Sequence, residues 1–105
     1  MVLTFDNSYA RDLQGAYIPV PPQGFPDPTL LTFNKGLADA LGLPALSDHD
    51  AAQLCSGTTV PQGATPIAQA YAGHQFGGFS HQLGDGRAVL LGELIDPAGE
   101  RWDLQ

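Results

Sequence analysis

The chain has 105 residues, of which 43% are hydrophobic and 14% are charged, and its net charge at pH 7 is −7. That length fits one small domain or a part of one, and the apolar content is opposite to the composition of a disordered chain. The four fixed cations, Arg11, Lys35, Arg87 and Arg101, are too few to neutralise a nucleic acid or to hold an anionic membrane, so neither is expected as a partner.

The charged fraction is also well below the roughly 25% of a self-contained globular domain. A surface with so little charge suggests that more polypeptide covers part of it. Cys55 is the single cysteine, so the chain forms no internal disulfide, which is consistent with a reducing compartment. The N-terminus lacks the features of a signal peptide, and no apolar run approaches the roughly 20 residues of a membrane span. We therefore expect a cytoplasmic protein.

The first 33 residues are predicted to form an extended arm, irregular over residues 1–28. Five prolines fall within ten positions: Pro19, Pro21, Pro22, Pro26 and Pro28. Proline lacks the N–H group that helices and sheets use, which favours an extended, polyproline-like backbone. The arm is either a motif that docks a partner or a segment that wraps the body of its own protein. The second interpretation is favoured because short proline clusters are common in ordinary loops.

Residues 34–78 are predicted to contain short helices and loops. A helix is expected over residues 34–41, with Asn34 as its cap and Gly42 in the left-handed position after the last turn. A second helix is expected over residues 48–55, with Asp48 as its cap. The apolar residues of both helices are interpreted as core.

A loop rich in Gly, Thr and Pro follows over residues 56–66, and residues 67–71 are predicted to be helical. Residues 79–105 are predicted to form an antiparallel three-stranded β-meander. Its strands are expected at residues 79–83, 87–95 and 100–105. The turns carry Asp85-Gly86 and Asp96-Pro97-Ala98-Gly99, both of which are typical hairpin sequences.

The second turn also predicts a register. If residues 96–99 form a tight hairpin, Ile95 pairs near Glu100, and the numbers of paired residues sum to 195 or to 196 if a bulge forms at Gly99. The predicted fold class is therefore α+β, with an extended Pro-rich arm and short helices followed by a meander.

Gly84-Asp85-Gly86-Arg87 is the motif that most clearly indicates a binding function. Glycines in a turn between strands let backbone N–H groups approach phosphate oxygens, and an arginine adds a forked cation suited to phosphate. The residues alone favour the alternative, an ordinary hairpin turn with a surface arginine, since Asp-Gly is a very common hairpin signal. The motif is neither a dinucleotide-binding fingerprint nor a Walker A loop.

Other combinations of residues are weaker candidates. His49, His74 and His81 with Cys55 match no zinc spacing, so local hydrogen bonding is the preferred interpretation. Asp85, Glu93 and Asp96 could form a carboxylate set, but both aspartates suit turns better. Cys55 has no basic neighbour that would activate its thiol. No catalytic or metal-binding residue is therefore assigned.

Three blocks of sequence resemble the selenoprotein O (YdiU-type) family. They are Phe5-Asp6-Asn7-Ser8-Tyr9-Ala10, then Pro66-Ile67-Ala68 with Ala70-Tyr71-Ala72-Gly73-His74-Gln75-Phe76-Gly77, and finally Gln82-Leu83-Gly84-Asp85-Gly86-Arg87-Ala88. Their order and spacing also match, and the resemblance covers essentially the whole chain.

The resemblance implies a protein-kinase-like fold, of which this chain is the start of the N-lobe. It also implies an enzyme that uses ATP and a divalent metal, Mg²⁺ or Mn²⁺, to transfer AMP to Ser, Thr or Tyr hydroxyls of other proteins. By the same resemblance Gly84 and Gly86 approach the nucleotide phosphates through their backbone, and Arg87 binds them through its side chain. The resemblance thus reverses the preference for an ordinary turn.

In the family the chain continues after residue 105 with Leu-Lys-Gly, and the strand lysine, two arginines, the catalytic aspartate and the metal ligands all follow. We therefore expect the 105 residues alone to bind no cofactor tightly and to be inactive without the remainder of the domain. Two alternatives stay open: a stand-alone module that binds a nucleotide or a partner without chemistry, and a structural truncation product. A reading frame continuing beyond residue 105 would distinguish them.

Overall fold

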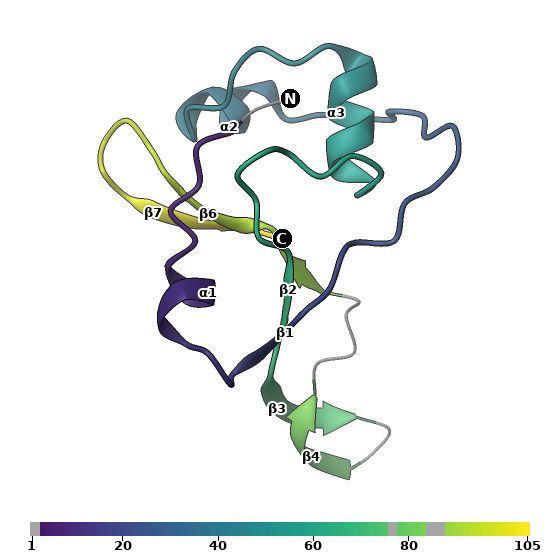
Figure 1. Cartoon of the computed structure of the whole chain (residues 1–105). Coiled ribbons are helices and arrows are strands. Elements are labelled where there is room, and N and C mark those ends of the chain that lie inside the picture. The colour runs from purple at the N-terminus through teal and green to yellow at the C-terminus, as the bar shows by residue number, and fades with distance from the viewer. Residues whose placement is uncertain (1–2, 76–77, 84–87) are drawn as a thin grey trace.

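The computed structural model describes residues 3–75, 78–83 and 88–105. Within these residues, the three helices lie in the first 55 residues and six of the seven strands follow them, which confirms the α+β class (Figure 1). In chain order the elements are α1 (Ser8–Asp12), β1 (Tyr17–Pro19), α2 (Lys35–Ala40), α3 (Asp48–Cys55), β2 (Ile67–Gln69), β3 (Tyr71–Gln75), β4 (Gly78–Leu83), β5 (Val89–Leu90), β6 (Gly92–Ile95) and β7 (Arg101–Leu104).

The helices α2 and α3 lie where the sequence predicts them. The Asn34 side chain accepts a hydrogen bond from the Leu37 N–H at 2.9 Å, and Gly42 has a left-handed φ of 77°. The cap of α3 differs from the prediction. Ser47, rather than Asp48, is the cap, and its hydroxyl accepts from the Asp50 N–H at 3.1 Å. Asp48 instead occupies the first turn, where its carboxylate interacts favourably with the positive end of the helix dipole.

The N-terminal arm is more ordered than predicted, because it contains α1 and β1. β1 pairs antiparallel with β2, and Pro19 lies at its last position on the edge of the sheet. A proline is tolerated there because an edge strand does not need every N–H group. Residues 20–34 follow without helix or strand, as expected for the proline-rich part.

The prediction of a helix at residues 67–71 is wrong. Ile67 and Ala68 lie in β2, the middle strand of a sheet with the order β1-β2-β5. Both residues are almost fully buried, with exposed fractions of 1% and 2%. A run of so few apolar residues fits a buried strand and a buried helix equally well. Pairing with β1 and β5, which are distant in sequence, stabilises this segment as a strand.

The predicted meander is also wrong in its connections, although every strand pair is antiparallel. β4 pairs with the preceding strand β3, and β5 pairs with β2, with Ile67 opposite Leu90. The second expected strand pair is present as the hairpin β6–β7. Figure 1 shows β3 and β4 as a separate hairpin at the end of the molecule opposite α2 and α3. The predicted central strand is therefore divided between two sheets.

The hairpin β6–β7 confirms the predicted register. Ile95 pairs with Arg101 and Gly92 with Leu104, so the paired numbers sum to 196. In the turn, the Asp96 side chain accepts from the Glu100 N–H at 2.8 Å, and the Asp96 carbonyl accepts from the Gly99 N–H at 2.9 Å. The extra residue in the turn is the bulge that the higher sum requires.

The core lies between the sheets and the two longer helices. Leu3, Leu54, Val89 and Leu91 form its buried cluster, and Leu104 packs against them. Val89 and Leu91 are two positions apart, so their side chains lie on the same face of the strand. Among the described residues, no helix is long and apolar enough to cross a membrane.

Candidate functional site

The predicted phosphate-binding residues Gly84, Gly86 and Arg87 lie outside the described residues. The structure describes the strands on either side, β4 up to Leu83 and β5 from Val89. The segment that follows the motif, from residue 88 onward, lies within the described residues.

That segment is held firmly in two sheets. Leu90 pairs with Ile67 and is only 1% exposed. One residue later the Leu91 N–H donates to the Leu104 carbonyl at 2.8 Å, which joins the strand to the β6–β7 hairpin. A loop that carries binding residues gains precision when a rigid scaffold positions its ends. Here the scaffold begins two residues after Arg87.

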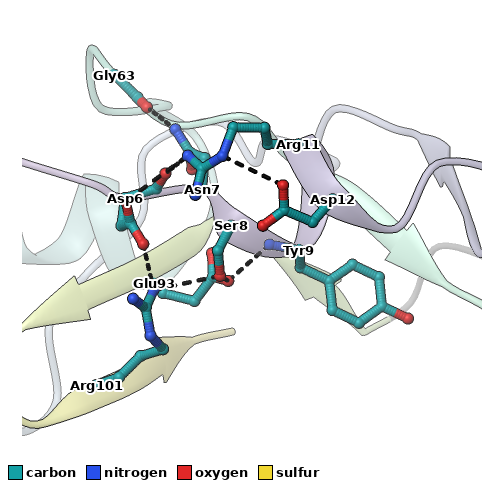
Figure 2. A network of polar contacts seen from close by, with 9 residues as sticks. All are labelled: Asp6, Asn7, Ser8, Tyr9, Arg11, Asp12, Gly63, Glu93 and Arg101. Atoms are coloured by element: carbon teal, nitrogen blue, oxygen red, sulfur yellow. Dashed lines mark hydrogen bonds and ion pairs between the residues drawn. The ribbon is translucent and has the colours of Figure 1, made fainter.

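The hairpin is fixed to the N-terminal segment by a buried carboxylate, Glu93 (Figure 2). Glu93 is 4% exposed, and its Oε1 accepts from the Ser8 hydroxyl at 2.5 Å and from the Tyr9 N–H at 2.8 Å. The Asp6 N–H adds a bond to the Glu93 carbonyl at 3.0 Å. The short helix α1 has no side-chain cap of its own. The Glu93 carboxylate therefore satisfies an N–H group that the first turn leaves free.

A second contact places Asn7 against Gly92. Asn7 has a left-handed φ of 53°, and its Nδ2 donates to the Gly63 carbonyl at 2.7 Å. A Cβ atom at Gly92 would lie 2.5 Å from Asn7 Oδ1 and 2.6 Å from Phe5 Cδ1, so only glycine fits there. Asn7 Oδ1 and Glu93 Oε2 are buried without a hydrogen-bond partner among the described residues.

Charged groups complete the network at its exposed side. Arg101 Nη1 lies 2.5 Å from Asp6 Oδ2 and also donates to the Ser8 hydroxyl at 3.2 Å. Arg11 lies 3.7 Å from Asp6 Oδ1 and 3.4 Å from the Asp12 carboxylate. The hydrogen bond from Arg101, aided by both positive charges, lowers the pKa of Asp6. These charged groups form ion pairs with one another. The network therefore fits a structural role better than the binding of a charged ligand.

The network is made by the first sequence block that carries the family resemblance, residues 5–10, and a comparison with known proteins decides the family. A family model described as "Protein adenylyltransferase SelO" matches residues 1–105. The chain belongs to the SelO family.

Curated members of the SelO family agree with this assignment. The chain is 58% identical over 106 aligned positions to the protein nucleotidyltransferase YdiU of Cereibacter sphaeroides, an alignment that covers 100% of this chain and 22% of that protein. It is 50% identical over 101 positions to the protein of the same name from Roseobacter denitrificans, covering 96% of this chain and 22% of the relative. The chain thus spans about a fifth of the length of these relatives.

Sequence reasoning missed the role of Glu93 within this SelO chain. The residue had been weighed only as part of a carboxylate set with Asp85 and Asp96. One signal was available, because Glu93 is the single charged residue in the apolar run from residue 88 to residue 95. A charge in such a run is buried and needs partners. The interpretation of Asp96 as a turn residue is confirmed, since its carboxylate accepts from Trp102 Nε1 and the Glu100 N–H, which lower its pKa.

The described part of this SelO chain does not fit a divalent metal. No group of three His, Cys, Asp or Glu residues is placed to hold a metal ion within residues 3–70 and 88–105, where side chains are described. Cys55 is exposed at the end of α3. A metal that assists nucleotidyl transfer neutralises phosphate charge, and we assign no such role to the residues described.

Proposed function

We propose that this chain is the N-terminal part of an enzyme that transfers AMP from ATP to Ser, Thr or Tyr hydroxyls of other proteins. The observation that carries the proposal is the SelO-family match over residues 1–105, which includes Gly84-Asp85-Gly86-Arg87. The names of the curated relatives, protein nucleotidyltransferases, are consistent with it. We further propose that residues 1–105 form the start of a kinase-like N-lobe and work together with the remainder of that domain.

In this reaction the acceptor oxygen forms a bond to the α-phosphorus of ATP, and the bond from that phosphorus to the β-phosphate bridging oxygen breaks. Pyrophosphate leaves, and the hydroxyl proton passes to a base outside these residues. Such transfers depend chiefly on positioning and on neutralising phosphate charge. The backbone N–H groups of Gly84 and Gly86 would donate hydrogen bonds to phosphate oxygens, and the Arg87 guanidinium would add the positive charge.

The hairpin register supports this placement of the site. In β6–β7 the paired numbers sum to 196, whereas the bond from the Leu91 N–H to the Leu104 carbonyl joins residues whose numbers sum to 195. A strand continuing from β7 would therefore place its position 107 opposite Ala88 or Val89 (195 − 107 = 88, 196 − 107 = 89). That is the position where the resemblance implies a lysine. The residue opposite such a lysine would lie one or two positions along the chain from Arg87. Two cations from adjacent strands would then serve one phosphate site.

The test uses a full-length chimera, in which this chain replaces the aligned region of the Cereibacter sphaeroides relative. The chimera is incubated with a protein acceptor and with ATP labelled either on the α-phosphate or on the γ-phosphate. We expect label from the α-phosphate to appear on the acceptor, at hydroxyl side chains identified by mass spectrometry. Label from the γ-phosphate alone would mean phosphoryl transfer and would contradict the proposal.

We expect the 105-residue chain by itself to transfer no nucleotide and to bind ATP weakly, since the resemblance assigns to it one arginine and one glycine turn as phosphate contacts. Isothermal titration calorimetry of the isolated chain with ATP checks this expectation. Micromolar binding would favour a stand-alone nucleotide-binding module.

A further inference from the structure

A pocket of about 600 Å³ lies on the side of the sheet that faces α2 and α3. Its wall includes core residues of α3 and the strands, together with Phe25 from the proline-rich segment and Leu37 from α2. The core residues are Leu54, Val89 and Leu91. Protein interiors contain few voids larger than a water molecule. A space of this size that opens directly onto core side chains is therefore a part of the core that this chain does not fill.

The rim of the pocket is apolar and exposed. Phe25 and Leu37 are each 52% exposed, and both line the pocket. None of the described lining residues carries a charge. An occupant with phosphate groups would find no compensating cation among them, whereas apolar side chains would remove the exposed surface of both residues from water. The chemistry of the wall therefore favours an apolar peptide segment.

Two observations and one general principle point to the source of that segment. Leu104, the last residue of β7, and Gln105 after it form part of the pocket wall, so a chain leaving β7 starts beside the pocket. The aligned region is 22% of the Cereibacter sphaeroides relative, so 78% of that protein (100 − 22) lies outside it. Segments of one polypeptide also meet at high effective concentration. We infer that this pocket receives apolar side chains from the region that the full-length relatives carry outside the aligned residues.

The inference goes beyond the proposed function, because it concerns how the domain is completed and does not depend on ATP. It is tested in the chimera by two substitutions of exposed leucines, Leu37→Asp and Leu31→Asp. Leu31 is 95% exposed and is not among the described lining residues. We expect Leu37→Asp to lower the thermal unfolding midpoint of the chimera by several degrees and Leu31→Asp to leave it unchanged. Equal effects of the two substitutions would overturn the inference.

A second measurement does not require a destabilised variant. Cys55 lines the pocket and is exposed in this chain. Maleimide labelling of Cys55, followed by peptide mass spectrometry, should be at least about tenfold slower in the native chimera than in the same chimera unfolded with urea, since labelling then requires local opening. Equal rates would overturn the inference. Protection that appears only after ATP is added would also overturn it, because the occupant would then be the nucleotide.

These outcomes are separate from the test of the proposed function. A chimera that transfers no nucleotide but protects Cys55 would leave the docking inference standing. A chimera that transfers AMP while Cys55 reacts at the unfolded rate would leave the proposed function standing and overturn the docking inference.

Discussion

The β-strands that follow the glycine-rich motif are held in two different ways by the rest of the chain. The segment around Glu93 in β6 is bonded to residues 6–9 through a polar network within this chain. The side chains of Val89 and Leu91 instead face an apolar pocket that stays open. Directional hydrogen bonds fix a register and an orientation, whereas apolar burial requires only matching volume. This difference is what the docking inference leads us to expect if the N-terminal segment sets the geometry and other polypeptide completes the core.

The substitution Glu93→Ala tests the polar network around Glu93, and we expect it to have the largest effect. This change leaves the Ser8 hydroxyl and the Tyr9 N–H without their acceptor in a buried site, which should lower the free energy of unfolding of the chain by about 2–4 kcal/mol. Urea unfolding followed by circular dichroism measures it. Glu100→Ala is the control, because Glu100 is exposed in the turn. Equal losses for the two variants would mean that the network contributes nothing specific.

The substitution Gly92→Ala tests the close approach between the N-terminal segment and β6, and we expect the next largest effect from it. In Gly92→Ala the new methyl group would overlap Asn7 Oδ1 and the Phe5 ring, and overpacking of this kind costs about 1–3 kcal/mol. The hairpin should shift away from the N-terminal segment. Hydrogen exchange at the Asp6 N–H, which donates to the Glu93 carbonyl, should accelerate. Unchanged exchange would show that the two segments are not in firm contact.

A second glycine substitution, Gly36→Ala, should change the free energy of unfolding in the opposite direction. Gly36 lies in α2, and a Cβ there would meet Asn34 Oδ1 at 3.6 Å, an ordinary contact distance. Alanine favours a helix over glycine by about 0.5–1 kcal/mol, so Gly36→Ala should raise the free energy of unfolding by that amount. The same urea experiment checks it. A loss of stability would show that α2 is packed more tightly than the open pocket implies.

The smallest expected effect concerns pH at the exposed edge of the network. The hydrogen bond from Arg101 lowers the pKa of Asp6 in the folded chain, so Asp6 stabilises the fold above its unfolded pKa of about 4 and loses this contribution as pH falls through its lower folded pKa. Asp6→Asn should therefore reduce the fall in urea midpoint between about pH 6 and pH 3. Part of the fall should persist, because the pKa of Asp96 is also lowered. An identical fall in both proteins would contradict the Asp6–Arg101 contact.

The local features of the fold could be read from the sequence, whereas the long-range pairings could not. Asn34 and the turn beginning at Asp96 act on atoms within four residues, so their chemistry is visible in a short window. The partners of β2 and β5, and of Glu93 and Ser8, lie far apart along the chain. No local pattern indicated that Ile67 would pair with Leu90 or that Glu93 would meet α1. The prediction that Gly84, Gly86 and Arg87 bind phosphate came from the resemblance, because Gly-Asp-Gly-Arg alone fits a simple turn.

The most direct test of the account is the contribution of Arg87 to nucleotide binding. Calorimetry with ATP compares the chimera with its Arg87→Ala and Lys35→Ala variants, each of which loses one positive charge. Hydrogen bonds from a charged group contribute about 1.5–3 kcal/mol, so Arg87→Ala should weaken ATP binding at least about tenfold, while Lys35→Ala should leave it unchanged. Equal affinity of the chimera and its Arg87→Ala variant would contradict the assignment of Gly84–Arg87 as the phosphate site.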